Sequence, residues 1–137
     1  MQHSEFSAQY AELPFAERCS QVDALVLRAF EAAQLAATVC AVGGYGRCEL
    51  FPYSDVDLLV LVDSAASADA AKDSLSRFQR QLWDAGLRIA QSVRTVEECC
   101  EIHEGNLELT ISLLDRRYLC GDSARYQALE PRFARFL

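Results

Sequence analysis

The chain contains 137 residues and carries a formal net charge of −7, with 13 Lys and Arg against 20 Asp and Glu. This length is typical of one domain, and a composition that is 51% hydrophobic and 24% charged favours a packed core over intrinsic disorder. Net acidity argues against a protein that coats DNA or RNA nonspecifically, because such proteins neutralise phosphates with basic side chains. The most apolar stretch, residues 58–62, is far shorter than the roughly 20 residues of a membrane-spanning helix.

The first residues lack the basic start and apolar block of a secretory signal, and they include Glu5 and Glu12. We therefore expect a cytoplasmic protein. Along the chain we expect an N-terminal arm over residues 1–15 and a single domain over residues 16–137. The six cysteines form no C-x-x-C pair, so we expect mostly buried thiols in a reducing compartment rather than metal ligands or disulfides. The amphipathic end of the chain favours a piece of a longer protein.

Helices and strands are expected to alternate along the chain, because runs with a three- to four-residue apolar period alternate with short β-branched runs. The expected elements are a helix over 22–33, a strand over 38–42, a loop or short helix over 45–54, a strand over 55–62, a helix from Ser67, a strand over 87–93, a short helix from Thr95, a helix from Asn106 through Leu114, an apolar piece over 118–120, and a last helix with Tyr126, Leu129 and Phe133 on one side. This order predicts an α/β or α+β sheet domain. Of these we expect an α+β domain, with an α/β-type mixed sheet flanked by helices.

Local signals place several of these boundaries. Ser67 can cap a helix whose left-handed stop is Gly86, and residues 95–98 fit a capping box. Phe78 and Trp83 on that helix are expected in the core.

Two carboxylates open the strand over residues 55–62. Asp55 and Asp57 point to the same face because a strand has a period of two, and their attachment points are about 6.6 Å apart. Carboxylates at this spacing can converge on Mg²⁺. The spacing alone is weak, since nine Asp residues in 137 give about 0.6 chance occurrences, and a charged strand end in water is the alternative. Burial of two like charges beside an apolar strand favours the cation site.

A Gly-Gly pair follows the preceding strand. Gly43 and Gly44 lack a Cβ and so let backbone amides approach an anion, and Arg47 can add a planar donor to the same phosphates. The alternative is an ordinary turn with Arg47 in solvent. The third glycine of a dinucleotide-binding fingerprint would fall at Glu49, and the chain has no P-loop motif.

Together, the Gly-Gly turn and the D-x-D motif are typical of the nucleotidyltransferase superfamily that includes DNA polymerase beta. The wider sequence GGYGRCELFPYSDVDLLV (residues 43–60) resembles the N-terminal nucleotidyltransferase domain of the bifunctional uridylyltransferase/uridylyl-removing enzymes that act on the nitrogen regulatory protein PII. The resemblance covers about residues 20–125 and continues through residues 82–87, 92–99 and 113–122.

The resemblance implies a polymerase beta-like fold and transfer of UMP from UTP to a tyrosine of PII. It implies that Gly43 and Gly44 hold the triphosphate and that Asp55 and Asp57 bind Mg²⁺. Ser54 would set the turn before the metal ligands or touch phosphate.

The chain departs from the family pattern at Cys48, where the family usually has glycine. A third carboxylate is common in the superfamily, and Asp115 is a candidate here, with Glu97 a weaker one and a salt-bridged structural acid the alternative for both. Arg94, Arg116 and Arg117 could line an anionic cleft, with solvated or ion-paired side chains as the alternative.

Other functions remain open at this point. One is an adenylyltransferase of the type that modifies glutamine synthetase, and another is a noncatalytic nucleotide-binding fragment. A cysteine-based metal or redox module is a third alternative, for which the spacing of the cysteines gives little support.

Overall fold

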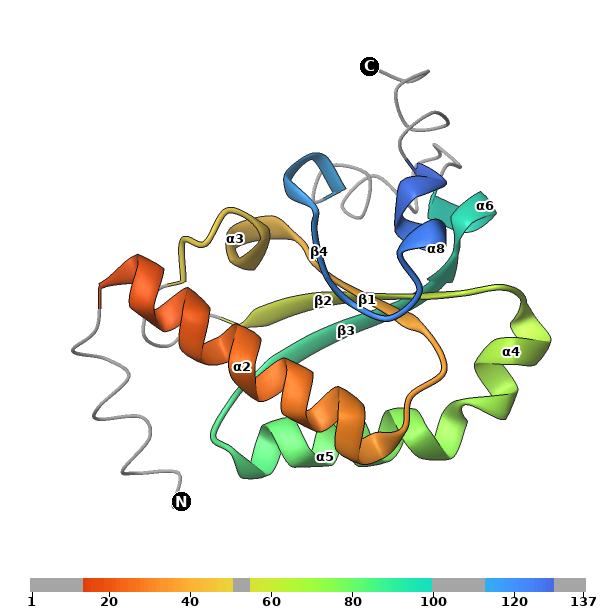
Figure 1. The fold of residues 1–137 in the computed structure, drawn as a ribbon, viewed down its shortest axis with the longest axis horizontal. Helices are drawn as coiled ribbons and strands as arrows, with labels where there is room; N and C mark the ends of the chain where they lie inside the picture. Colours follow the sequence, from red (N-terminus) through yellow and green to blue (C-terminus); the bar gives the residue numbers. More distant parts are fainter. Residues whose placement is uncertain (1–13, 51–54, 100–112, 130–137) are drawn as a thin grey trace.

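Four strands form one mixed sheet in the order β3-β2-β1-β4 (Figure 1). A computed structural model describes residues 14–50, 55–99 and 113–129 of the chain. Strand β1 pairs antiparallel with β2 and β4, whereas β2 and β3 run parallel. The strands are β1 (Thr38–Ala41), β2 (Val56–Val62), β3 (Ile89–Thr95) and β4 (Arg117–Cys120). The apolar piece expected over residues 118–120 is therefore an edge strand.

Helices cover both faces of the sheet (Figure 1). On one face, the long helices α2 (Phe15–Ala33) and α5 (Lys72–Asp84) enclose the larger core, which contains Val26, Phe78 and Val60. On the other face, a smaller cluster packs against Leu59 and Leu61. The shorter elements are α3 (Gly43–Gly46), α4 (Ala65–Ala70), α6 (Val96–Cys99), the 3₁₀ helix η2 (Leu113–Asp115) and α8 (Ser123–Gln127). The expected α+β fold is confirmed.

The side chains of β2 alternate between these two cores. Val56 and Leu58 point toward the larger core, whereas Leu59 belongs to the smaller cluster. Because successive side chains of a strand point to opposite faces, Asp57 emerges on the face of Leu59, near the start of the strand. The apolar strand therefore fixes the face on which the carboxylate lies.

The helix expected from Ser67 begins earlier and is interrupted. Ser64 caps α4 by accepting a hydrogen bond from the Ser67 amide at 3.2 Å. Ser64 lies between the end of β2 and the first turn of α4, whose amides have no partner within the helix. A non-helical backbone at Ala71 then separates α4 from α5. The predicted end is confirmed, since Gly86 has a φ of +98° after α5.

The predicted capping box is confirmed. The Glu98 amide donates to Thr95 Oγ1 at 3.1 Å, and the Thr95 amide donates to Glu98 Oε1 at 2.9 Å. The prediction of a helix reaching Leu114 is wrong at its end, where the chain forms η2. The 3₁₀ turn tightens the chain just before it enters β4. Residues 100–112 lie outside the described part of the chain.

Phe78 and Trp83 differ in burial. Phe78 is fully buried as predicted, but the prediction for Trp83 is wrong, because 59% of this residue is exposed. Leu82 already faces the sheet, and the next residue of a helix is rotated by about 100° from it. Trp83 therefore points away from the core.

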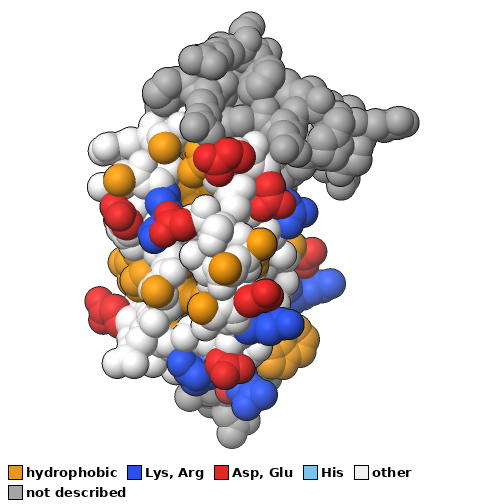
Figure 2. Space-filling view, turned by 90° about the vertical axis from the view of Figure 1, so that its right-hand side faces the viewer, with side chains coloured by type: hydrophobic (Ala, Val, Ile, Leu, Met, Phe, Trp, Pro, Cys, Tyr) orange, Lys and Arg blue, Asp and Glu red, His pale blue; other side chains and the backbone are white. Residues whose placement is uncertain are grey.

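Figure 2 shows a face on which acidic and basic side chains lie next to one another rather than in separate areas. This face has no stripe of positive charge of the kind that a nucleic-acid backbone requires. Within residues 14–50, 55–99 and 113–129, no helix is both long and apolar enough to span a bilayer.

Candidate functional site

One edge of the sheet gathers most of the residues that the sequence analysis identifies. Antiparallel pairing places the end of β1 beside the start of β2 and the start of β4, and β3 starts at the same edge because it runs parallel to β2. Gly43, Asp57 and Asp115 therefore lie at one edge although they are far apart in the sequence. Glu97 follows the far end of β3 and so lies at the opposite edge. The structure thus separates Glu97 from the carboxylates of Asp55 and Asp57.

Gly43 lies against the carboxylate of Asp57. The Val42 amide donates to the Asp57 carbonyl oxygen at 3.2 Å, which pairs the end of β1 with the start of β2. A Cβ on Gly43 would lie 3.0 Å from Asp57 Oδ2, and the φ of Gly43 is +58°. Glycine is favoured here for both reasons, because a side chain would crowd the carboxylate and strain the backbone.

Asp55 lies close enough to Asp57 for its charge to affect the ionisation of Asp57. Partial burial, and then the negative charge of Asp55, raise the pKa of Asp57 above its ordinary value. Asp55 is about half exposed, and one of its carboxylate oxygens lies 3.4 Å from Arg88 Nε. The structure therefore brings the two predicted carboxylates together and leaves Asp57 in an environment that a cation would relieve.

The carboxylates of Asp55 and Asp57 fit Mg²⁺, because this ion prefers hard oxygen ligands. They lie beside the Gly43 turn, where a Cβ would fill the space next to Asp57. Among the residues described, no group of three or more His, Cys, Asp or Glu side chains is arranged to hold a metal. Mg²⁺ commonly uses one or two carboxylates and completes its coordination with water and substrate phosphates. Two carboxylates are therefore sufficient when water and a phosphate complete the coordination of the ion.

The predicted turn at Gly43 and Gly44 is the start of the one-turn helix α3, and the alternative of a short helix for the following segment applies to Tyr45 and Gly46. The Gly46 amide donates to the Val42 carbonyl at 3.0 Å, and the Arg47 amide donates to the Gly43 carbonyl at 3.1 Å. Val42 at the N-cap contributes no side-chain hydrogen bond. The first amides of a helix have no partner within the helix, so this turn presents donors next to Asp57.

Arg47 and Asp115 bind each other. Arg47 Nη1 lies 2.6 Å from Asp115 Oδ2, and Arg47 Nε lies 3.1 Å from Glu49 Oε2. These carboxylates raise the pKa of Arg47, whose side chain is about half exposed. The salt-bridged alternative therefore describes Asp115 in this structure, and Arg47 would have to leave both acids to reach a phosphate. Ser54 lies outside the described residues.

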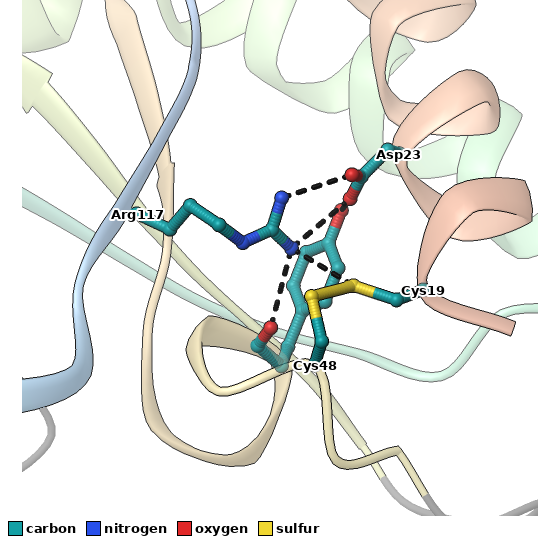
Figure 3. The surroundings of a disulfide bond; sticks show 5 residues. Cys19, Asp23, Cys48 and Arg117 are labelled. Carbon is teal, nitrogen blue, oxygen red and sulfur yellow. Dashed lines mark hydrogen bonds and ion pairs between the residues drawn. A yellow bond between two sulfur atoms is a disulfide. The ribbon is translucent and has the colours of Figure 1, made fainter. Parts of the chain in front are cut away.

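A polar network that was not expected from the sequence joins α3 to α2 and β4 (Figure 3). The hydroxyl of the fully buried Tyr45 donates to Asp23 Oδ1 at 2.6 Å. Arg117 donates to Asp23 Oδ2 at 2.9 Å and to the Tyr45 carbonyl at 3.3 Å. Arg117 is therefore ion-paired rather than directed into an anionic cleft. The sequence offered no signal for Asp23, because its partners come from α3 and β4.

Cys19 and Cys48 form a disulfide between α2 and the segment after α3, which corrects the expectation of free thiols at these positions (Figure 3). Their Cα atoms lie 5.3 Å apart although the residues are separated by 29 positions, so no local spacing could indicate the pair. Cys48 has a φ of +57°, the region that favours glycine. Cys40, Cys99 and Cys120 are buried and outside any disulfide, as expected.

Replacing Tyr45 by Phe tests the support of α3. The ring fits the same buried space, but Asp23 loses a 2.6 Å hydrogen bond, so the free energy of unfolding should fall by about 1–2 kcal/mol. Urea denaturation measures this loss. Tyr118→Phe is a matched control, because the Tyr118 hydroxyl donates to the Gly121 carbonyl in an exposed position and its loss should cost less. Equal losses in both variants would contradict the structural role of Tyr45.

Replacing Gly43 by Ala tests the contact with Asp57. The new Cβ would displace the carboxylate and leave a left-handed residue strained by about 1–2 kcal/mol. Affinity for a Mg²⁺–triphosphate should therefore fall at least about tenfold, measured by calorimetric titration. Gly86→Ala is the control, since Gly86 also has a positive φ but follows α5. A similar loss of affinity in the control would assign the effect to backbone strain alone.

The chain matches the sequence profile of a known family and a set of curated relatives. The profile described as "Nucleotidyltransferase domain" matches residues 24–119. The similar relatives are named bifunctional uridylyltransferase/uridylyl-removing enzyme. The protein of Pseudomonas putida (strain GB-1) is 45% identical over 96 residues, which are 70% of this chain and 11% of the relative. That of Cupriavidus pinatubonensis is 44% identical over 113 residues, or 81% of this chain and 13% of the relative.

A more distant relative, from Haemophilus influenzae, is 36% identical over 116 residues, or 82% of this chain and 13% of the relative. The chain thus spans about a tenth of the length of the curated relatives that it matches. The family match includes β1, α3, β2 and β3, and so contains the edge where Gly43 meets Asp57. The chain belongs to the nucleotidyltransferase domain family.

Proposed function

We propose that this chain is the catalytic domain of a Mg²⁺-dependent uridylyltransferase that transfers UMP from UTP to a tyrosine of the PII protein and releases pyrophosphate. The observation that carries the proposal is the contact between the Gly43 backbone and the Asp57 carboxylate, with Asp55 beside it. The names of the relatives support uridylyl transfer as the reaction. The acceptor follows from the family resemblance.

In this proposal, each group at the sheet edge has a separate task. Asp55 and Asp57 would hold Mg²⁺, which when bound neutralises phosphate charge and activates the attacking oxygen. The amides at the start of α3 would bind the β- and γ-phosphates, and Arg47 would add a donor after leaving Asp115.

The reaction is a displacement at the α-phosphorus of UTP. The acceptor oxygen forms a bond to this phosphorus, the bond to the bridging oxygen of the β-phosphate breaks, and pyrophosphate leaves. The residues described here act by positioning the triphosphate and by stabilising its charge. A domain that uses a nucleoside triphosphate as donor is proposed to work in the cytoplasm, where such donors are made.

The test uses the 137-residue chain with Mg²⁺ and labelled UTP, ATP, CTP or GTP, in the presence and absence of PII. We expect Mg²⁺-dependent binding of UTP, and pyrophosphate release with label transfer when PII is present. Preference for ATP would instead support an adenylyltransferase. Binding without pyrophosphate release would support a noncatalytic nucleotide-binding fragment. Absence of Mg²⁺-dependent binding of any triphosphate would contradict the proposed function.

A further inference from the structure

The connections that join helix α2 to α3 and the residues after it include a disulfide and a side-chain hydrogen bond (Figure 3). Cys19 and Asp23 are four positions apart on α2 and therefore lie on the same face. Cys19 is bonded to Cys48, and Asp23 accepts the hydrogen bond of the Tyr45 hydroxyl. The disulfide is covalent and can be reduced by thiol exchange, whereas the hydrogen bond between Tyr45 and Asp23 does not respond to reduction.

We propose that Cys19 and Cys48 form a reversible thiol–disulfide site that controls triphosphate binding at the edge where Gly43 meets Asp57. The disulfide state binds the triphosphate more tightly than the dithiol state. This inference rests on the proposed function, because it concerns the same nucleotide site.

Backbone hydrogen bonds connect the disulfide to α3, whose first amides would bind the triphosphate. The Cys48 amide donates to the Tyr45 carbonyl at 3.0 Å, and the Glu49 amide donates to the Gly44 carbonyl at 2.8 Å. Cys48 also holds a left-handed backbone that non-glycine residues disfavour. Reduction removes the covalent link that keeps Cys48 in this conformation, so the residue can relax and move the end of α3.

The surroundings of the two sulfur atoms favour attack at Cys48 and departure of Cys19 as the leaving thiolate. Cys48 is half-buried and therefore more exposed than Cys19, which is 3% exposed, so we assign the attack of a small thiol to Cys48. Arg117 Nη2 lies 3.1 Å from Cys19 Sγ. A guanidinium beside the leaving sulfur stabilises it as a thiolate, which speeds exchange.

The exchange balances with a small thiol as the reductant. Its thiolate forms a bond to Cys48 Sγ, the bond between the two protein sulfurs breaks, and the electron pair remains on Cys19. A second thiol then attacks the added sulfur of the mixed disulfide, which releases the oxidised small-molecule disulfide and leaves two protein thiols. Two electrons pass from the small thiols to the protein.

The other cysteines that the structure describes do not compete in this reaction. Burial raises the pKa of Cys40 and of Cys120 to about 12, so neither forms appreciable thiolate near neutral pH. Cys99 is fully buried. Disulfides of cytoplasmic proteins are usually transient and redox-sensing or catalytic, which agrees with a reversible pair in a cytoplasmic domain.

The test compares the oxidised 137-residue chain with the same chain reduced by dithiothreitol, and measures the affinity for Mg²⁺–UTP by calorimetric titration. Reduction should weaken binding at least about fivefold. By linkage, saturating Mg²⁺–UTP should shift the equilibrium of the pair with glutathione toward the disulfide by the same factor, which a merely structural crosslink would not do. Cys19→Ser should bind as weakly as the reduced chain, whereas Cys120→Ser should keep the full redox effect.

The wild-type comparison does not depend on the folding of any variant, and circular dichroism of the reduced chain checks that it remains folded. Equal or tighter binding by the reduced chain would overturn the inference and leave the proposed function intact. Global unfolding on reduction would also overturn it, because the effect would not be local. Failure of both states to bind Mg²⁺–UTP would overturn the inference together with the proposed function.

Discussion

Replacing Asp57 by Asn should reduce Mg²⁺-dependent transfer by on the order of 10³-fold or more and leave the chain folded. The amide keeps the size of the side chain next to Gly43 but removes the negative charge that would hold the metal ion. Pyrophosphate release and Mg²⁺–UTP affinity measure the loss. Unchanged turnover would remove the metal role assigned to Asp57.

The same substitution should not destabilise the chain at neutral pH. Burial and the charge of Asp55 raise the pKa of Asp57, so the folded state favours its protonated form. The stability that comes from this preference is present below the ordinary carboxyl pKa and is lost as the pH rises through the raised pKa. Above that range the neutral Asn variant should melt at the same temperature as wild type or higher.

Asp63→Asn provides a control of opposite sign. Arg125 lowers the pKa of Asp63 through a hydrogen bond at 2.8 Å, so this carboxylate stabilises the folded state above its ordinary pKa and loses that effect in acid. The Asp63 variant should therefore melt below wild type at neutral pH. Melting curves from pH 3 to 8 compare the two variants. A large loss of stability in Asp57→Asn at neutral pH would contradict the assigned environment.

Replacing Gly46 by Ala should cost more than about 4 kcal/mol of folding free energy or prevent folding. A Cβ on Gly46 would lie 2.0 Å from the Asp115 carbonyl oxygen and 3.2 Å from that of Ala41. Both are backbone atoms, so no side chain can rotate away, and α3 would have to separate from η2. Urea denaturation and the yield of folded protein measure the effect.

Gly44→Ala is the matched control for this substitution. Its Cβ would lie 3.4 Å from the Glu49 carbonyl oxygen, an ordinary contact, and Gly44 lies in the same short helix. We expect a change in stability within about 1 kcal/mol. If both variants were equally stable, the close packing of α3 on η2 would be wrong.

The parts of the fold that depend on local pattern could be predicted from the sequence. The apolar run of β2 and the capping box at Thr95 depend on residues within one element. The proximity of the Asp55 and Asp57 carboxylates could be predicted from the period of two of a strand. This prediction needs no knowledge of the strands that pair with β2. Antiparallel pairing of β1 with β2, which places Gly43 beside Asp57, did not follow from either pattern alone.

Interactions between distant segments could not be predicted. Arg47 could be assigned to an anion from its position after the glycines, but its ion pair with Asp115 depends on how η2 packs against α3. The contact of Arg88 with Asp55 requires the parallel pairing of β3 with β2. The disulfide of Cys19 joins a helix to a segment that is adjacent only in the folded chain.

We propose that the start of α3 and the carboxylates of Asp55 and Asp57 form one site for a metal ion and a triphosphate. Mn²⁺ can replace Mg²⁺ at oxygen ligands and broadens the NMR signals of nearby nuclei. In the presence of a non-hydrolysable UTP analogue, Mn²⁺ should broaden the amide signals of Gly43, Gly44, Asp55 and Asp57 before any others. Broadening that spares these amides, or that is unchanged in Asp57→Asn, would contradict the claim.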